Sequence, residues 1–119
     1  MSFDEKSEIA KRAYSFAVQI IKITAKLPKN AANLIIIRQI IRSATSIGAN
    51  IEEALGGHTR NDFIYGMNVA KKEARETRYW LRIVYDTNEV LHRELEILLQ
   101  ESEQLINILT KIVKTSSRK

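Results

Sequence analysis

Cysteine is absent from the 119-residue sequence, proline occurs once and glycine four times. Without thiols the chain cannot form disulfides, thiolate metal sites or a cysteine nucleophile. So few helix breakers leave long stretches free to be helical. No apolar run reaches the roughly 18 residues of a membrane span, and residues 1–8 lack the apolar region of a signal peptide. These absences predict a cytoplasmic protein that does not enter membranes.

The length suits one domain, and the composition is that of a folded protein. Apolar residues make up 45% and charged residues 28%, which is typical of globular and not of disordered chains. The net charge of +5 is spread unevenly. Residues 59–86 carry six basic and four acidic groups (+2), whereas residues 87–110 carry one basic and five acidic groups (−4). This pattern indicates pairing within the fold as readily as an anionic partner.

Apolar residues recur at alternating steps of three and four in four successive segments, as in amphipathic helices. The expected helices span residues 3–27, 32–55, 59–86 and 88–114. The connections are only a few residues long, so consecutive helices must be antiparallel. The predicted fold class is therefore all-α, an antiparallel up-down-up-down four-helix bundle. It fills one domain, 1–114, and leaves 115–119 as a frayed basic tail.

Residues that cap or stop helices stand at the expected boundaries. The N-terminal signals are capping boxes and N-cap residues, at Ser2 with Glu5, at Thr59 with Asp62, and at Asn88. The first helix should stop before Pro28, because the residue preceding a proline avoids the helical region. Gly56 and Gly57 should end the second helix by supplying a positive φ.

The first two helices carry more apolar residues than one core stripe needs. Their expected core stripes are Ala10, Ala13, Ala17, Ile20, Thr24 and Leu27, and Ile37, Ile40, Ala44, Ile47 and Ile51. Outside these stripes lie Ile9, Phe16 and Ile23, and Leu34, Ile35, Ile36 and Ile41. A helix that is apolar nearly all round is central or buried against another subunit, and four-helix bundles have no central helix. We therefore expect a homo-oligomer, with Ile35, Ile36 and Ile41 partly at the subunit interface.

The third helix carries a Glu-x-x-Glu pair, Glu73 and Glu76. Paired carboxylates can perform acid–base chemistry. The second helix offers hydrogen-bonding partners in one stripe, at Gln39, Ser43, Ser46 and Asn50. We interpret these six residues as a structural polar network between the two helices, since such networks fix helix register.

The same helix carries a basic stripe, made of Lys71, Arg75, Arg78 and Arg82 with Lys72 beside it. Like charges at this spacing cost about 0.2–0.5 kcal/mol per pair, so something outside the helix must compensate. One candidate is an acidic stripe on the fourth helix, at Glu89, Glu96 and Glu103. The other is a phosphate backbone, with Tyr79 and Trp80 nearby for base stacking, although Trp80 suits the core better. The residues alone leave both open.

No constellation for catalysis, metal or cofactor binding is complete. A di-iron bundle needs two Glu-x-x-His motifs, and only Glu89 to His92 provides one. His58 lies in a glycine-rich turn, and no nucleophile–base set is assembled. Gly48 and Gly66 stand alone within helices, where glycine permits close helix approach. We predict no enzyme activity, metal or cofactor.

Two stretches, residues 41–54 (IRSATSIGANIEEA) and 62–84 (DFIYGMNVAKKEARETRYWLRIV), resemble the bacterial intervening-sequence proteins encoded inside 23S ribosomal RNA genes. The residues that match the family pattern are Arg42, Ser43, Ser46, Ile47, Asn50, Ile51 and Glu53, and Phe63, Ala70, Glu73, Glu76, Tyr79 and Leu81. The resemblance implies a four-helix bundle assembled as a homopentamer. It also implies kinship to the accessory proteins of diversity-generating retroelements, which bind nucleic acid.

Two functions follow from these observations. The first is a non-enzymatic oligomer that binds RNA or another nucleic acid through Lys71, Lys72, Arg75, Arg78 and Arg82. The second is a structural or adaptor oligomer whose partner is a protein. They differ in whether the basic stripe faces solvent or is neutralised by the fourth helix.

Overall fold

The computed structural model describes residues 3–118, with side chains for residues 8–118. It contains four helices, α1 (Phe3–Thr24), α2 (Ala31–Leu55), α3 (Arg60–Thr87) and α4 (His92–Ser116). No strand occurs among the described residues. The prediction of an all-α chain with four helices is therefore confirmed. None of the described helices combines the length and hydrophobicity that crossing a bilayer requires.

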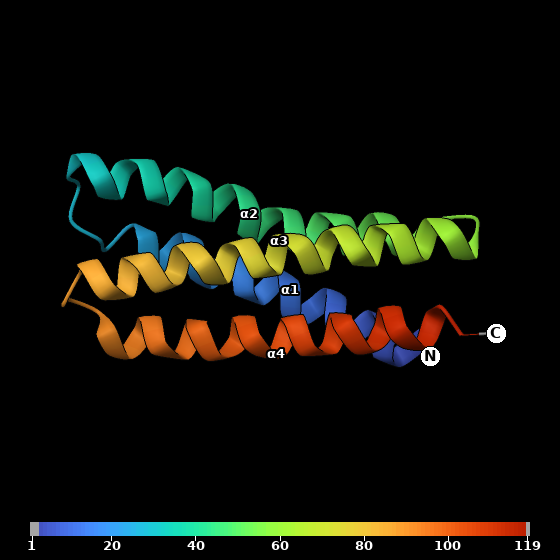
Figure 1. The fold of residues 1–119 in the computed structure, drawn as a ribbon. Coiled ribbons are helices and arrows are strands. Elements are labelled where there is room, and N and C mark those ends of the chain that lie inside the picture. The colour runs from blue at the N-terminus through green and yellow to red at the C-terminus, as the bar shows by residue number, and fades with distance from the viewer. Residues whose placement is uncertain (1–2, 119) are drawn as a thin grey trace.

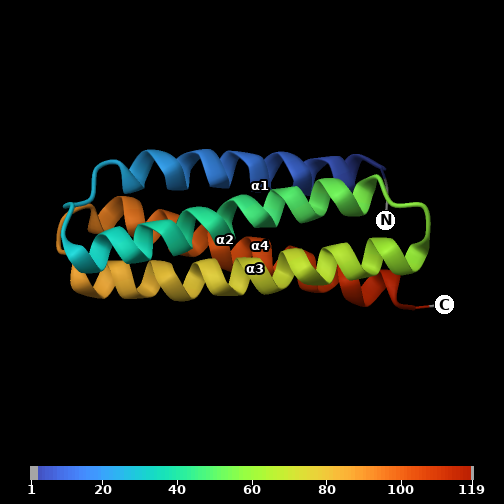
Figure 2. The same ribbon diagram turned by 90° about the horizontal axis from the view of Figure 1, so that it is seen from above.

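The helices lie side by side in a rod of 48 × 21 × 18 Å, and each contacts two neighbours (Figures 1 and 2). Consecutive helices run in opposite directions, so α1 begins at the end of the rod where α4 finishes (Figure 1). The most extensive contact joins α2 to α3 and the least extensive joins α1 to α4. The α2–α3 pair is thus the tightest part of the bundle.

Among the described side chains, two ion pairs join α1 and the connection that follows it to α4. The guanidinium of Arg12 donates two hydrogen bonds to Glu101, at 3.0 and 2.6 Å. These bonds raise the pKa of Arg12 above its ordinary value. Lys26 Nζ lies 3.2 Å from Glu94 Oε2. Both pairs are partly exposed, so each contributes modestly to stability.

The predicted start of α3 is confirmed, because Thr59 accepts a hydrogen bond from the backbone N–H of Asp62 at 3.0 Å. α2 is capped by Asn30, whose side chain accepts from the N–H of Asn33 at 2.8 Å. α1 ends at Thr24, three residues before the predicted end, and α4 continues two residues past its own, to Ser116. The structure describes no side chain for Ser2 or Glu5, so the predicted capping box lies outside the described residues. The same holds for residue 119, the last of the predicted basic tail.

The prediction that Asn88 starts the fourth helix is wrong. Asn88 follows the end of α3, and α4 begins four residues later at His92. Its side chain is buried and hydrogen-bonded to Asn33, so it is not available to cap α4. The chain reverses instead through Leu91, which adopts φ 65° without being a glycine.

The predicted positive φ at the end of α2 is also wrong. Gly56 has φ −87°, and no glycine of the described chain has a positive φ. The helix ends in a tighter turn of the 3₁₀ type, since the N–H of Gly57 donates to the carbonyl of Ala54, three residues earlier, at 3.2 Å. A Cβ on Gly57 would lie 3.1 Å from the Cβ of Asp62, so this glycine serves a close contact with the start of α3.

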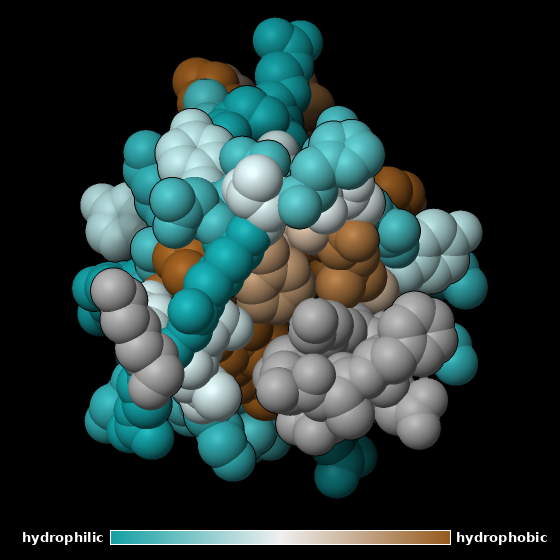
Figure 3. Space-filling model, turned by 90° about the vertical axis from the view of Figure 1, so that its right-hand side faces the viewer, coloured by the Kyte–Doolittle hydropathy of each residue, from teal (hydrophilic) through white to brown (hydrophobic). Residues whose placement is uncertain are grey.

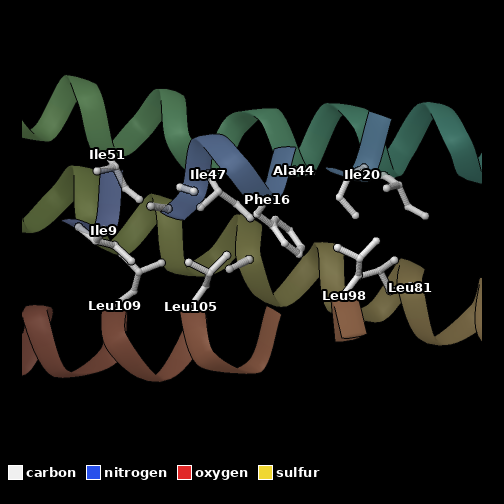
Figure 4. Close-up of a cluster of buried hydrophobic side chains, with 14 of the residues drawn as sticks. Ile9, Phe16, Ile20, Ala44, Ile47, Ile51, Leu81, Leu98, Leu105 and Leu109 are labelled. Carbon is white, nitrogen blue, oxygen red and sulfur yellow. The ribbon is translucent and has the colours of Figure 1, made fainter. Parts of the chain in front are cut away.

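The core runs the length of the rod, with side chains from all four helices meeting along its axis (Figure 4). The core residues expected on α3 and α4 recur at the spacing of three and four, and Phe63 and Leu91 are half-buried while the others are buried, namely Met67, Ala70, Ala74, Thr77, Leu81 and Val84, and Leu95, Leu98, Ser102, Leu105, Leu109 and Ile112. The expected α1 stripe needs correction. Ile9, Phe16 and Ile23, assigned to a surplus, are buried within the monomer, whereas Ala10 and Ala17 are only half-buried. α1 is oriented with its larger side chains facing the core, because these bury more apolar area than alanine does.

One glycine brings α2 and α3 together. A Cβ on Gly66 would lie 2.7 Å from the Cβ of Ala54 and 3.2 Å from its Cα. Only glycine fits this crossing, which confirms the prediction of close helix approach. Gly48 is less restricted, since its nearest neighbour, the Cβ of Ala13, would be 3.6 Å away.

Candidate nucleic-acid interface

The basic residues of α3 lie on its outer surface and on the flank toward α4. We call Lys71, Lys72, Arg75, Arg78 and Arg82 the basic face. Lys72, Arg75 and Arg82 are exposed, whereas Lys71 and Arg78 are half-buried. Lys71 and Arg78 are seven residues apart and so lie on the same flank of α3, from which Arg78 contacts Glu103 of α4.

The acidic residues expected to neutralise the basic face are mostly placed elsewhere. Glu89 precedes α4 and lies in the turn after α3. Glu96 is exposed on α4 and takes part in no ion pair among the described side chains. Glu103 contacts Arg78, whose Nε lies 3.4 Å from its Oε1. Among described residues, therefore, the acidic stripe pairs with one cation of the basic face.

The polar residues between α2 and α3 meet around an arginine. Arg42 of α2 contacts both predicted carboxylates, with Nη1 lying 3.4 Å from Glu73 Oε1 and Nη2 bonded to Glu76 Oε2. Gln39 accepts from Arg42 Nε at 3.4 Å. The predicted residues Gln39, Glu73 and Glu76 are therefore joined through a residue that sequence reasoning left out of the network. The sequence does contain an indication of this role, because Arg42 is a cation beside the polar stripe of α2 and can pair with the two glutamates of α3.

The other predicted members have different partners. Ser43 is buried and hydrogen-bonds to Thr77 of α3 at 2.7 Å between hydroxyl oxygens. Ser46 donates to the carbonyl of Arg42, and Asn50 donates to the carbonyl of Ser46, each at 2.8 Å. The side-chain bonds of Ser46 and Asn50 thus stay within α2, whereas Ser43 crosses to α3.

Two aromatic residues adjoin the basic face. Tyr79 is exposed and Trp80 is half-buried against the core. Their rings meet edge to face, with centroids 5.3 Å apart. Trp80 Nε1 donates to Glu76 Oε2 at 3.2 Å, which ties this pair to the polar network.

The apolar residues expected at a subunit interface differ in exposure. Ile35 is 65% exposed, and Leu34 beside it is also exposed. Ile36 and Ile41 are half-buried, and Ile36 packs against the core of its own bundle. Of the three residues predicted at the interface, Ile35 therefore exposes the most apolar surface.

Neither histidine belongs to a cluster. Among the described residues, no group of three or more His, Asp or Glu is placed to hold a metal ion. His92 stacks on Tyr85, with ring centroids 4.2 Å apart, and its Nε2 lies 2.8 Å from the Tyr85 carbonyl oxygen. His58 is exposed in the α2–α3 turn. His92 therefore joins the start of α4 to the end of α3.

A hollow lies at the end of the rod where the α2–α3 turn meets the end of α4. It has a volume of about 850 Å³ and is lined by residues that include Tyr14, Leu55, His58 and Phe63. Seen from this end, the described surface is mainly hydrophilic around a smaller apolar area (Figure 3). The hollow reaches the first turn of α3, and its lining includes no residue of the basic face.

Comparison with known proteins confirms the family resemblance. The family model described as 23S rRNA-intervening sequence protein matches residues 5–111. The chain is also similar to a crystal structure of a protein of unknown function from the S23 ribosomal protein family of Bacteroides thetaiotaomicron VPI-5482. The two share 34% identity with a TM-score of 0.84, over 92% of this chain and 98% of that one. Comparison with curated proteins finds no match.

Proposed function

The chain belongs to the 23S rRNA-intervening sequence protein family, and from this premise we propose that it is a non-enzymatic, cytoplasmic homo-oligomer that binds RNA through the basic face of α3. A bundle of this kind supplies a rigid rod on which a row of long cationic side chains can follow a phosphate backbone. The proposal contains no catalytic step.

One observation carries the proposal. Of the five cations in the basic face, only Arg78 has an acidic partner among the described residues. Its pair with Glu103 is long, at 3.4 Å, and forms no hydrogen bond at Arg78 Nε among the described residues, so it is weak. Lys72, Arg75 and Arg82 remain exposed and near one another on α3. Bound phosphates would neutralise these cations and so relieve their mutual repulsion.

Assembly of several copies would strengthen this binding. The exposed apolar surface at Ile35 favours association with another subunit. The family resemblance implies five subunits. Each subunit of a ring would present its own basic face, so after the first contact the remaining contacts become intramolecular and the overall affinity rises.

Binding of a structured RNA at low and moderate salt tests the proposal. The charge-reversal variant Arg75→Glu with Arg82→Glu should lose most of the affinity, because both residues are exposed and neither has an acidic partner among the described side chains. The matched control is Lys11→Glu with Lys22→Glu, which changes the net charge equally on exposed positions of α1. Light scattering should show that all three proteins assemble alike.

If the intact oligomer does not bind RNA at low salt, the proposal is wrong. It is also wrong if the α3 variant binds as well as the wild type, or if the α1 control weakens binding as much. In those cases an adaptor oligomer with a protein partner becomes the better explanation.

A further inference from the structure

Tyr79 lies among the cations of the basic face. Its side chain is 54% exposed on the outer surface of α3. Arg75 precedes it by four residues and Arg82 follows it by three, so one arginine lies a turn away on each side of the ring, on the same helix face. Lys72 lies two turns away on that face. An aromatic surface is therefore bracketed by groups that bind phosphate.

The Tyr79 ring is supported by the neighbouring Trp80 ring. The two rings meet edge to face, with their centroids 5.3 Å apart. Trp80 is itself held by its hydrogen bond to Glu76 and by packing against the core. Glu76 in turn is bonded to Arg42 of α2. Fixed side chains lose little freedom on binding, so a ring supported in this way is suited to receive a flat partner.

Tyr79 is distinguished from the other exposed tyrosines by this support. Tyr14 and Tyr65 are more exposed, at 72% and 73%. Neither has a ring contact among the described residues. Tyr14 also lies on α1, away from the basic face, which makes it a suitable control.

We infer that Tyr79 stacks on an unpaired nucleobase, so that the RNA bound by the basic face is single-stranded. This inference rests on the proposed function and narrows its substrate. Stacking requires a base with a free face, which duplex RNA offers only at its ends, whereas phosphate contacts are available in both forms. Arg75 and Arg82 would bind the phosphates on either side of the stacked base.

Trp80 provides the measurement, because it is the only tryptophan in the chain and its ring contacts Tyr79. Titration with oligouridylate should change Trp80 fluorescence, and an oligouridylate–oligoadenylate duplex should change it much less. Tyr79→Leu should weaken binding of the single strand by about five- to 150-fold, the range for loss of one stacked base, and leave duplex binding unaltered. Tyr79→Phe should bind as the wild type does, and so should Tyr14→Leu.

The variants separate the stacking inference from the proposed function. If Tyr79→Leu binds both RNAs as the wild type does, or weakens both equally, stacking at Tyr79 is wrong. The proposed function still stands in that case, provided that Arg75→Glu with Arg82→Glu abolishes binding. If the wild type binds neither RNA at low salt, both fail. Circular dichroism and light scattering confirm that each variant is folded and assembled, and Tyr79→Gln, which also removes the ring, provides the test if Tyr79→Leu is not.

Discussion

Asn33 and Asn88 hold the start of α2 against the end of α3 through reciprocal side-chain amide bonds, at 2.9 and 3.2 Å. Both residues are buried. The remaining donors are also satisfied, because Asn33 donates to the carbonyl of Pro28 and Asn88 to that of Val84. A buried polar pair with all its bonds made fixes one register between two helices.

Replacing one partner of this pair should destabilise the fold. Asn33→Leu leaves the Asn88 amide buried with fewer partners, and we expect the free energy of unfolding to fall by about 1–3 kcal/mol. The double variant Asn33→Leu with Asn88→Leu should lose less than the sum of the two single variants, because no amide is then left unpaired. Urea denaturation of the four proteins measures this coupling, and strictly additive losses would contradict it.

The helices and most of the core could be predicted from sequence, because apolar spacing depends on local geometry. The boundaries were less predictable. Asn88 has the side chain of an N-cap, yet its partner is Asn33, which comes from another helix and is found only in three dimensions. The α1 stripe was misplaced because alanine and isoleucine counted equally in the pattern, although burial favours the larger side chains.

The candidate site could be located but not completed from sequence. Helical spacing is enough to place Arg75 and Arg82 on one face of α3. The partners of these residues depend on how neighbouring helices are turned, and this decides that Glu103 pairs with Arg78 while Glu96 forms no ion pair among the described side chains. Arg42 was missed for the same reason, since its contacts with Glu73 and Glu76 cross from α2 to α3 and depend on how these two helices are turned.

Gly66→Ala should destabilise the bundle by about 1–3 kcal/mol. The added Cβ would lie 2.7 Å from that of Ala54, so α2 and α3 must move apart along their most extensive contact. Thermal or urea unfolding followed by circular dichroism measures the loss. Gly48→Ala is the matched control, because its Cβ has ordinary contact distances and alanine favours helix by about 1 kcal/mol. Equal losses in both variants would show that the close crossing is not the cause.

Glu73 and Glu76 should contribute to stability through Arg42 and not through a metal. Glu73→Gln and Glu76→Gln should each lower the free energy of unfolding by about 1 kcal/mol, a modest value because Arg42 is half exposed. In an Arg42→Met background the same substitutions should cost much less, since the charged partner is gone. A stoichiometric metal at these glutamates, found by elemental analysis of the purified protein, would overturn this interpretation.

The surface around Ile35 should mediate assembly. Ile35→Glu places a charge on an apolar position that is exposed in the monomer, so the monomer should fold normally while the oligomer dissociates. Light scattering should then report a mass near 13.7 kDa for the variant and a multiple of it for the wild type. Gln104→Glu, an exposed polar position on α4, is the control and should assemble as the wild type does. A wild-type monomer at micromolar concentration would contradict the prediction.

RNA binding should depend steeply on salt and on assembly. Each phosphate neutralised by the basic face releases condensed counterions, so the affinity of the wild type should fall with a large slope in log–log form as salt rises. The dissociated Ile35→Glu variant keeps its basic face but presents a single copy, so it should bind more weakly and with a smaller slope. Affinities measured over a series of salt concentrations separate the two effects. If the monomeric variant matches the wild type in both affinity and slope, the basic faces of neighbouring subunits do not act together.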